Sequence, residues 1–185
     1  MADEQWQVLT HSKLIGFAIG VTIFLFVLFK SEPGFVFLLD SANLLFHEAG
    51  HPFFGLISNR LAVYGGTLGQ LTFPIALIIS FWHKREPITF AASVIWFFEN
   101  FLNIARYMAD SRTLLLPLVG GGEHDWNEIF FRWTLLSNDT FIATLVKAIG
   151  WIGIGGTVGW LFWRGWQDRN RRSDPLPPTE LEPRP

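Results

Sequence analysis

Long apolar stretches separated by short polar or charged segments make up most of the first 163 residues. A helix needs about 20 mostly apolar residues to cross the hydrocarbon core of a bilayer. Five stretches approach or reach this length, and they cover residues 14–29, 35–57, 67–82, 88–109 and 141–163. The pattern predicts an all-α, multi-pass membrane helical bundle of about five transmembrane helices.

Two segments break this pattern. Residues 110–139 are polar and contain three consecutive glycines, so we expect an extramembrane loop. Residues 164–185 are rich in arginine and then in proline, a composition that cannot bury a core, and we expect a disordered cytoplasmic tail. Residues 1–163 are predicted to form one membrane-embedded domain.

The positions of lysine and arginine predict how five spans would be oriented, because loops rich in these residues stay in the cytoplasm. The richer set of loops would hold Lys30, Lys84, Arg85, Arg164, Arg169, Arg171 and Arg172. The poorer set would hold Lys13, Arg60, Arg112 and Arg132. We therefore expect the N-terminus and the 110–139 loop outside and the C-terminus in the cytoplasm.

Composition supports a membrane protein and narrows its chemistry. Half of the residues are hydrophobic, only 16% are charged, and the mean hydropathy is +0.30. Soluble domains carry about 25% charged residues. The chain has no cysteine, which excludes every thiolate metal site. No basic patch with interleaved aromatic residues occurs, so nucleic acid is not an expected partner.

The segment His47-Glu48-Ala49-Gly50-His51 lies in the second apolar stretch. Four-residue spacing puts His47 and His51 on one face of a helix, one turn apart, as two zinc ligands require. Glu48 is offset from that face and is predicted to activate a zinc-bound water as general base. Polar and ionisable residues inside a span are costly and are mostly functional. The pattern predicts one zinc ion in the outer half of the bilayer.

A catalytic zinc site usually has three protein ligands, and the fourth apolar stretch offers a candidate. A polar stripe runs along it at helical spacing and consists of Glu99, Asn103, Arg106 and Asp110. Asp110 is the predicted third ligand, and Asn103 and Arg106 are predicted substrate-binding residues. His124, in the segment Glu123-His124-Asp125-Trp126, is the alternative ligand, or else His124 and Asp125 bind substrate. Asp40 shares the helix face of His47 and is a candidate to orient an imidazole.

Three stretches together resemble the site-2 protease family of intramembrane zinc metalloproteases, and the chain is most similar to a group of short bacterial membrane proteins that are themselves peptidase-like. They are the HEAGH segment, the segment Gly65-Gly66-Thr67-Leu68-Gly69-Gln70 and residues 100–110. The second is similar to the family's Ala-Gly-Pro-Leu-Ala-Asn element, and the third to its approach to a Leu-Asp-Gly ligand motif. The resemblance implies that Asp110 is the third ligand and that Gln70 binds substrate or the developing oxyanion. The chain departs from the family at Thr67, in place of proline, and at Ser111, in place of glycine.

The residues and the resemblance predict an intramembrane zinc metalloprotease that hydrolyses peptide bonds of membrane-embedded substrates. We expect it in the bacterial inner membrane, with the lipid bilayer and a membrane-protein or peptide substrate as its partners. Two alternatives stay open. One is a non-catalytic membrane subunit whose zinc site is structural or lost, and the other is a zinc hydrolase that acts on lipid-like substrates.

Overall fold

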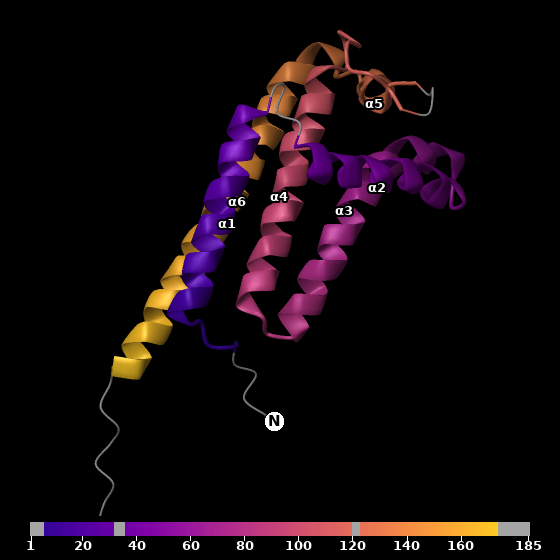
Figure 1. The fold of residues 1–185 in the computed structure, drawn as a ribbon. Helices are drawn as coiled ribbons and strands as arrows, with labels where there is room; N and C mark the ends of the chain where they lie inside the picture. Colours follow the sequence, from indigo (N-terminus) through magenta and orange to yellow (C-terminus); the bar gives the residue numbers. More distant parts are fainter. Residues whose placement is uncertain (1–5, 32–35, 120–122, 174–185) are drawn as a thin grey trace, which may run out of the picture.

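The computed structural model describes residues 6–31, 36–119 and 123–173. Within these ranges the chain forms helices and no β-strand, which confirms the all-α prediction (Figure 1). The elements in chain order are α1 (His11–Lys30), α2 (Phe37–Gly55), α3 (Asn59–His83), α4 (Pro87–Ala109), α5 (Asp125–Arg132), the 3₁₀-helix η1 (Leu136–Asn138) and α6 (Asp139–Ser173).

Four of these helices are long and apolar enough to cross a membrane: α1, α3, α4 and, together with η1, α6. They match the predicted spans 14–29, 67–82, 88–109 and 141–163. The protein is therefore a multi-pass membrane protein built as an α-helical bundle. Figure 1 shows α3 and α4 running antiparallel, with α6 beside the upper part of α4.

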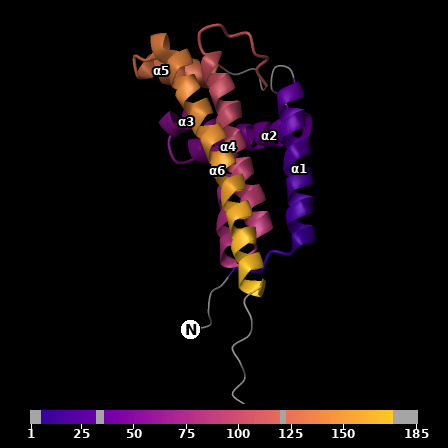
Figure 2. The same ribbon diagram turned by 90° about the vertical axis from the view of Figure 1, so that its left-hand side faces the viewer.

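The second predicted span, residues 35–57, differs from the rest. Its helix α2 is not among the candidate spans, and it runs crosswise to the bundle near the end that carries α5 (Figures 1 and 2). The physical reason is its buried polar face, since Asp40, Asn43 and His47 are each at most 7% exposed. Side chains of this kind need partners from the protein, and α2 finds them across α3 and α4.

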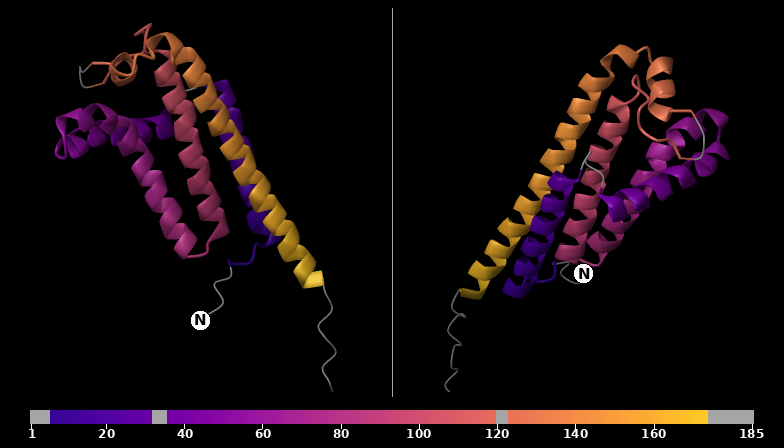
Figure 3. Two further views of the ribbon diagram at one scale, coloured as in Figure 1. Left: turned by 180° about the vertical axis from the view of Figure 1, so that it is seen from behind. Right: turned by 45° about the horizontal axis from the view of Figure 1, so that its top comes forward.

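The crosswise α2 changes the expected topology. The start of α1 and the end of α6 lie at the same end of the bundle (Figure 3). There the Leu9 amide donates to the Asp168 carboxylate at 2.9 Å, and Arg164 donates to the Trp6 carbonyl at 3.3 Å. Five spans would put these two chain ends on opposite sides of a membrane, whereas four spans put them on one side.

Helices α2 and α3 approach so closely that their backbones touch. A Cβ added to Gly50 would lie 2.0 Å from the Gly65 carbonyl oxygen and 2.9 Å from the Gly69 Cα. Only glycine permits this distance at all three positions. One turn earlier on α2, the His47 ring lies over Gly66, where a Cβ would come within 2.4 Å of it. Gly65, Gly66 and Gly69 of α3 therefore form the surface against which the HEAGH segment packs.

Candidate metal centre

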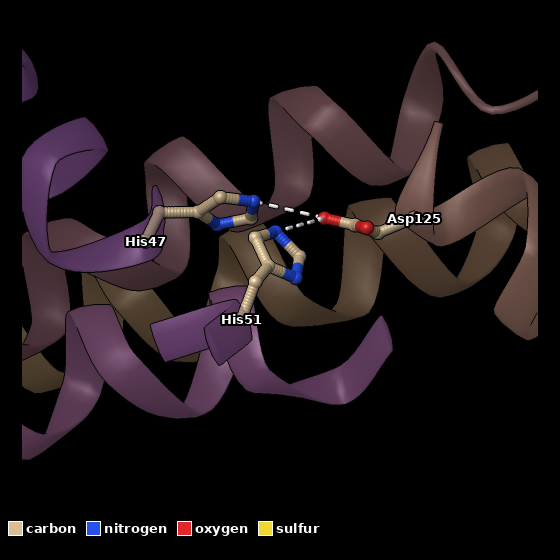
Figure 4. A group of neighbouring side chains, drawn as sticks. All are labelled: His47, His51 and Asp125. Carbon is tan, nitrogen blue, oxygen red and sulfur yellow. Dashed lines mark hydrogen bonds and ion pairs between the residues drawn. The ribbon is translucent and has the colours of Figure 1, made fainter. Parts of the chain in front are cut away.

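The two histidines of the HEAGH segment point at one carboxylate (Figure 4). His47 Nε2 lies 2.8 Å and His51 Nε2 3.3 Å from the same oxygen, Oδ2 of Asp125. The two rings are 4.9 Å apart between centroids and nearly perpendicular. One ligand atom from each of the three residues lies within 4.8 Å of the other two, so the group can hold a metal ion.

The second nitrogen of each imidazole is held by an acceptor on α3. His51 Nδ1 donates to the Ala62 carbonyl at 2.7 Å, and His47 Nδ1 lies 3.1 Å from Oε1 of Gln70. A carbonyl oxygen only accepts, so these bonds place a proton on each Nδ1 and turn the Nε2 side of each ring toward Asp125. Metal-binding histidines are typically oriented in this way by carbonyl or carboxylate partners.

Helix α5 brings Asp125 to the histidines. Its start is fixed by the His124 side chain, which accepts the Asn127 amide at 3.2 Å, and by the Asp125 amide, which donates to the Tyr107 hydroxyl at 3.2 Å. The apolar face of α5 is buried against α4 and α6, in a cluster that includes Trp126, Ile129, Phe130, Ile104, Met108 and Ala143. A short helix of eight residues is thus anchored well enough to position a ligand.

The donor set fits zinc. At Zn–N and Zn–O distances of about 2.0–2.2 Å, ligand atoms of a tetrahedral site lie about 3.3 Å apart. The distance from His51 Nε2 to Asp125 Oδ2 has this value, and the distance from His47 is somewhat shorter. Two imidazoles and one carboxylate are also a typical set for catalytic zinc, in which a fourth position stays open.

A cavity of about 780 Å³ opens beside the three donors. Candidate residues singled out in the sequence line it, among them Asp40, His47, Glu48, His51, Gln70, Asn103, Arg106 and Asp125. Apolar side chains complete the wall, among them Leu44, Val63, Ile104 and the run from Leu116 to Val119. The cavity therefore combines the candidate metal ligands, a carboxylate suited to proton transfer and space for an apolar molecule.

Asp110 lies outside this cavity lining and outside the group of three donors. Its carboxylate accepts the Thr113 hydroxyl at 2.5 Å and the amides of Leu115 and Leu116 at 2.9 and 3.0 Å. Burial alone would raise the pKa of Asp110, but these hydrogen bonds hold it below its usual range. In this structure Asp110 shapes the loop after α4, and Asp125 lies where the third ligand was expected.

His124, the alternative ligand, also points away from the two histidines of α2. Its Nε2 lies 3.5 Å from Asp110 Oδ2 and its ring lies against Tyr107, with centroids 4.1 Å apart. Burial lowers the pKa of His124, while the Asp110 carboxylate acts in the opposite direction. The segment from Glu123 to Trp126 does supply the third donor of the group, but this donor is Asp125 and not His124. The local sequence carries no signal that favours one of these two residues over the other.

The polar stripe of α4 binds the polar face of α2. Glu99 accepts from Asn43 at 2.8 Å, and Asn43 in turn accepts the Trp96 indole N–H at 2.8 Å. Asp40 accepts hydrogen bonds from the Asn103 side chain and from the Val36 amide, and the first of these holds α2 to α4. Within the part of the chain that the structure describes, Asp40 makes no hydrogen bond to an imidazole, so it does not orient one. The stripe thus fixes the helix that carries the candidate metal ligands.

Comparison with known proteins gives no match to a protein-family model, a curated protein or a solved structure. The likeness to site-2 proteases therefore rests on the three short stretches of sequence. The HEAGH segment and the stretch that ends at Gln70 meet at the cavity, whereas the stretch that ends at Asp110 contributes Asn103 and Arg106 to it but not its final carboxylate.

Proposed function

We propose that the protein is an intramembrane zinc metalloprotease that hydrolyses peptide bonds of membrane-embedded substrates. The observation that carries this proposal is the convergence of His47, His51 and Asp125 within 4.8 Å, beside a cavity that Glu48 also lines. Two imidazoles, one carboxylate and an adjacent glutamate are the parts that metal-assisted hydrolysis of an amide requires.

A zinc ion held by these donors would acidify a water molecule and polarise a substrate carbonyl. The chain's own residues supply the remaining steps. Ala62 and Gln70 keep the imidazoles in the ligating tautomer. Glu48 accepts the proton of the attacking water and returns it to the amide nitrogen as the C–N bond breaks.

The number of donors favours a catalytic site over a structural one. A closed site would need a fourth protein ligand, and the sequence offered Asp110 and His124 for that purpose. Both side chains face each other and the loop after α4 instead. Three donors next to a cavity of about 780 Å³ leave room for water and substrate.

Exposed apolar side chains near the cavity favour a substrate dissolved in the membrane. Helix α2 exposes Leu38, Leu45 and Phe53, and Leu56 follows its end; each is more than 60% exposed, and Leu115 in the loop after α4 is 82% exposed. Large exposed apolar surfaces of this kind lie against lipid or a partner. The same apolar surroundings favour, as a second candidate, hydrolysis of a lipid-like substrate.

We infer that the site faces the outer side of a bacterial inner membrane. At the end of the bundle that holds the chain ends lie Lys13, Lys84, Arg85, Arg164, Arg169, Arg171 and Arg172. At the end that holds the site lie Lys30, Arg60, Arg112 and Arg132. The richer end should be cytoplasmic, which places both chain ends inside.

The test compares wild-type protein with Glu48→Gln, each loaded with zinc and reconstituted with a set of single-span membrane proteins. We expect new N-termini within or next to the spans of some of these proteins with the wild type and none with Glu48→Gln. Metal analysis of both proteins checks that the substitution leaves zinc content unchanged. Cleavage that is equal in both proteins would contradict the proposal. Fatty acids or headgroups released only by the wild type would support the lipid-like substrate instead.

A further inference from the structure

Tyr107 lines the cavity but has no part in the mechanism outlined so far. Its hydroxyl accepts the backbone N–H of Asp125 at 3.2 Å, so it lies beside one of the three candidate ligands. Its ring meets that of His47 edge to face, with centroids 5.8 Å apart. Tyr107 therefore touches two of the residues that converge on the metal-binding position.

The orientation of Tyr107 is fixed from its other side. The His124 ring lies against the phenol ring, with centroids 4.1 Å apart. His124 Nδ1 accepts the Asn127 amide, which leaves the proton of the neutral ring on Nε2, 3.5 Å from the Asp110 carboxylate. Asp110 is itself bound to two backbone amides of the loop. Tyr107 thus lies between the His47 ring and a supported His124.

A phenol can accept and donate a hydrogen bond at the same time. Toward Asp125 the Tyr107 oxygen is the acceptor, so this contact leaves its own proton as a donor. A donor held in place beside a developing oxyanion stabilises it strongly, because the donor need not reorganise during the reaction. Gln70, to which the sequence comparison gave this role, lies behind His47, with its Oε1 on the Nδ1 side of the ring. The Tyr107 hydroxyl, beside the Asp125 amide, is therefore a further candidate for this role.

We propose that the Tyr107 hydroxyl donates a hydrogen bond to the substrate oxyanion and that the His124 ring packed against it is its positioning residue. This inference rests on the proposed function. When the water oxygen bonds to the carbonyl carbon, the π electrons move to the carbonyl oxygen and the water's proton moves to Glu48. The negative oxygen then accepts from Tyr107 until the C–N bond breaks and Glu48 protonates the nitrogen.

The test needs no substrate. Purified full-length protein is loaded with Co²⁺, whose visible spectrum reports its ligands, and is titrated with acetohydroxamate as an anionic oxygen ligand. We expect Tyr107→Phe to bind one cobalt with unchanged affinity and to bind acetohydroxamate about tenfold more weakly, which is the typical loss of a hydrogen bond to a charged group. The phenylalanine ring preserves the contacts with His47 and His124. The Asp125 amide loses its acceptor, but the His124–Asn127 hydrogen bond and the buried apolar face of α5 still hold the start of that helix.

The chain offers a matched control, since it has only two tyrosines. Tyr64 stacks on Trp133 with centroids 6.0 Å apart and is not part of the cavity lining. Tyr64→Phe should bind acetohydroxamate as the wild type does.

Equal acetohydroxamate affinity in Tyr107→Phe and wild type would overturn this inference and leave the proposed metal site standing. Loss of cobalt from Tyr107→Phe would also overturn it, by making Tyr107 a support for Asp125. A wild type that binds no cobalt would overturn both proposals.

Discussion

Asp110 and Asp125 lie on either side of the Tyr107–His124 pair, and only one of them faces the histidines of α2. Asp125 approaches both Nε2 atoms within 3.3 Å. Asp110 is bound to Thr113, Leu115 and Leu116, so its carboxylate faces the loop after α4. The two carboxylates therefore have different chemical roles even though both belong to the same end of the bundle.

Substituting each carboxylate separates these roles. Asp125→Asn removes an anionic donor and should weaken zinc binding by about 100-fold, since even a lost outer partner of a ligand costs 10–100-fold. Asp110→Asn should retain zinc but lower the stability of the loop, at a cost of about 1–3 kcal/mol. Competition with a chromophoric chelator measures the first effect and thermal unfolding the second. A greater loss of zinc from Asp110→Asn than from Asp125→Asn would make Asp110 the ligand.

The difference between these residues marks what sequence can and cannot predict about the site. His47 and His51 face one way because helical spacing alone decides it, and Glu48 follows from the same spacing. The third donor lies 78 residues from His47, and its direction depends on how the loop after α4 turns and how α5 docks. Neighbouring His124 and Asp125 are equally plausible donors by type, so only the three-dimensional arrangement distinguishes them.

At the scale of elements, α2 explains why five spans were expected and four are found. The prediction of five spans rested on the number of apolar residues in each stretch. This number does not show that Asp40, Asn43 and His47 lie on one buried face of α2. That face binds the polar stripe of α4 through Glu99 and Asn103, two residues that the sequence had already grouped by their helical spacing. The four long spans were predictable because length and hydropathy suffice for them.

The packing of the α3 glycines against α2 can be tested by substitution. Gly66→Ala would place a methyl group 2.4 Å from the His47 ring, which must then shift away from Asp125. We expect zinc affinity to fall by about 5- to 150-fold, since overpacking of this kind costs roughly 1–3 kcal/mol. Gly16→Ala is the matched control, because a Cβ there meets nothing within 4 Å. Equal zinc affinities in the two variants would mean that α2 and α3 are more loosely packed than described.

At the scale of the whole molecule, the two ends of the helical bundle hold different features. One end holds the cavity and the three candidate ligands. The other holds residues 6–9, where the Gln7 amide donates to the Arg85 carbonyl at 2.9 Å and the Leu9 amide to Asp168. These contacts tie residues 6–9 to the α3–α4 turn and to the end of α6, so these segments lie at one end of the bundle.

The absence of cysteine makes this arrangement directly measurable, because each introduced cysteine is the only one in the chain. Ser12 and Ser137 are exposed. Ser12 and Ser173, the last residue of α6, lie at the end of the bundle opposite the site, and Ser137 lies at the end that holds the site. In intact bacterial cells, a membrane-impermeant maleimide should label Ser137→Cys and neither Ser12→Cys nor Ser173→Cys until the membrane is permeabilised. Labelling of Ser12→Cys and Ser137→Cys, but not of Ser173→Cys, would support the five-span topology. Residues 12 and 173 lie on opposite sides of the membrane only if α2 also crosses it. Labelling of Ser12→Cys and Ser173→Cys without Ser137→Cys would keep four spans and turn the cavity toward the cytoplasm.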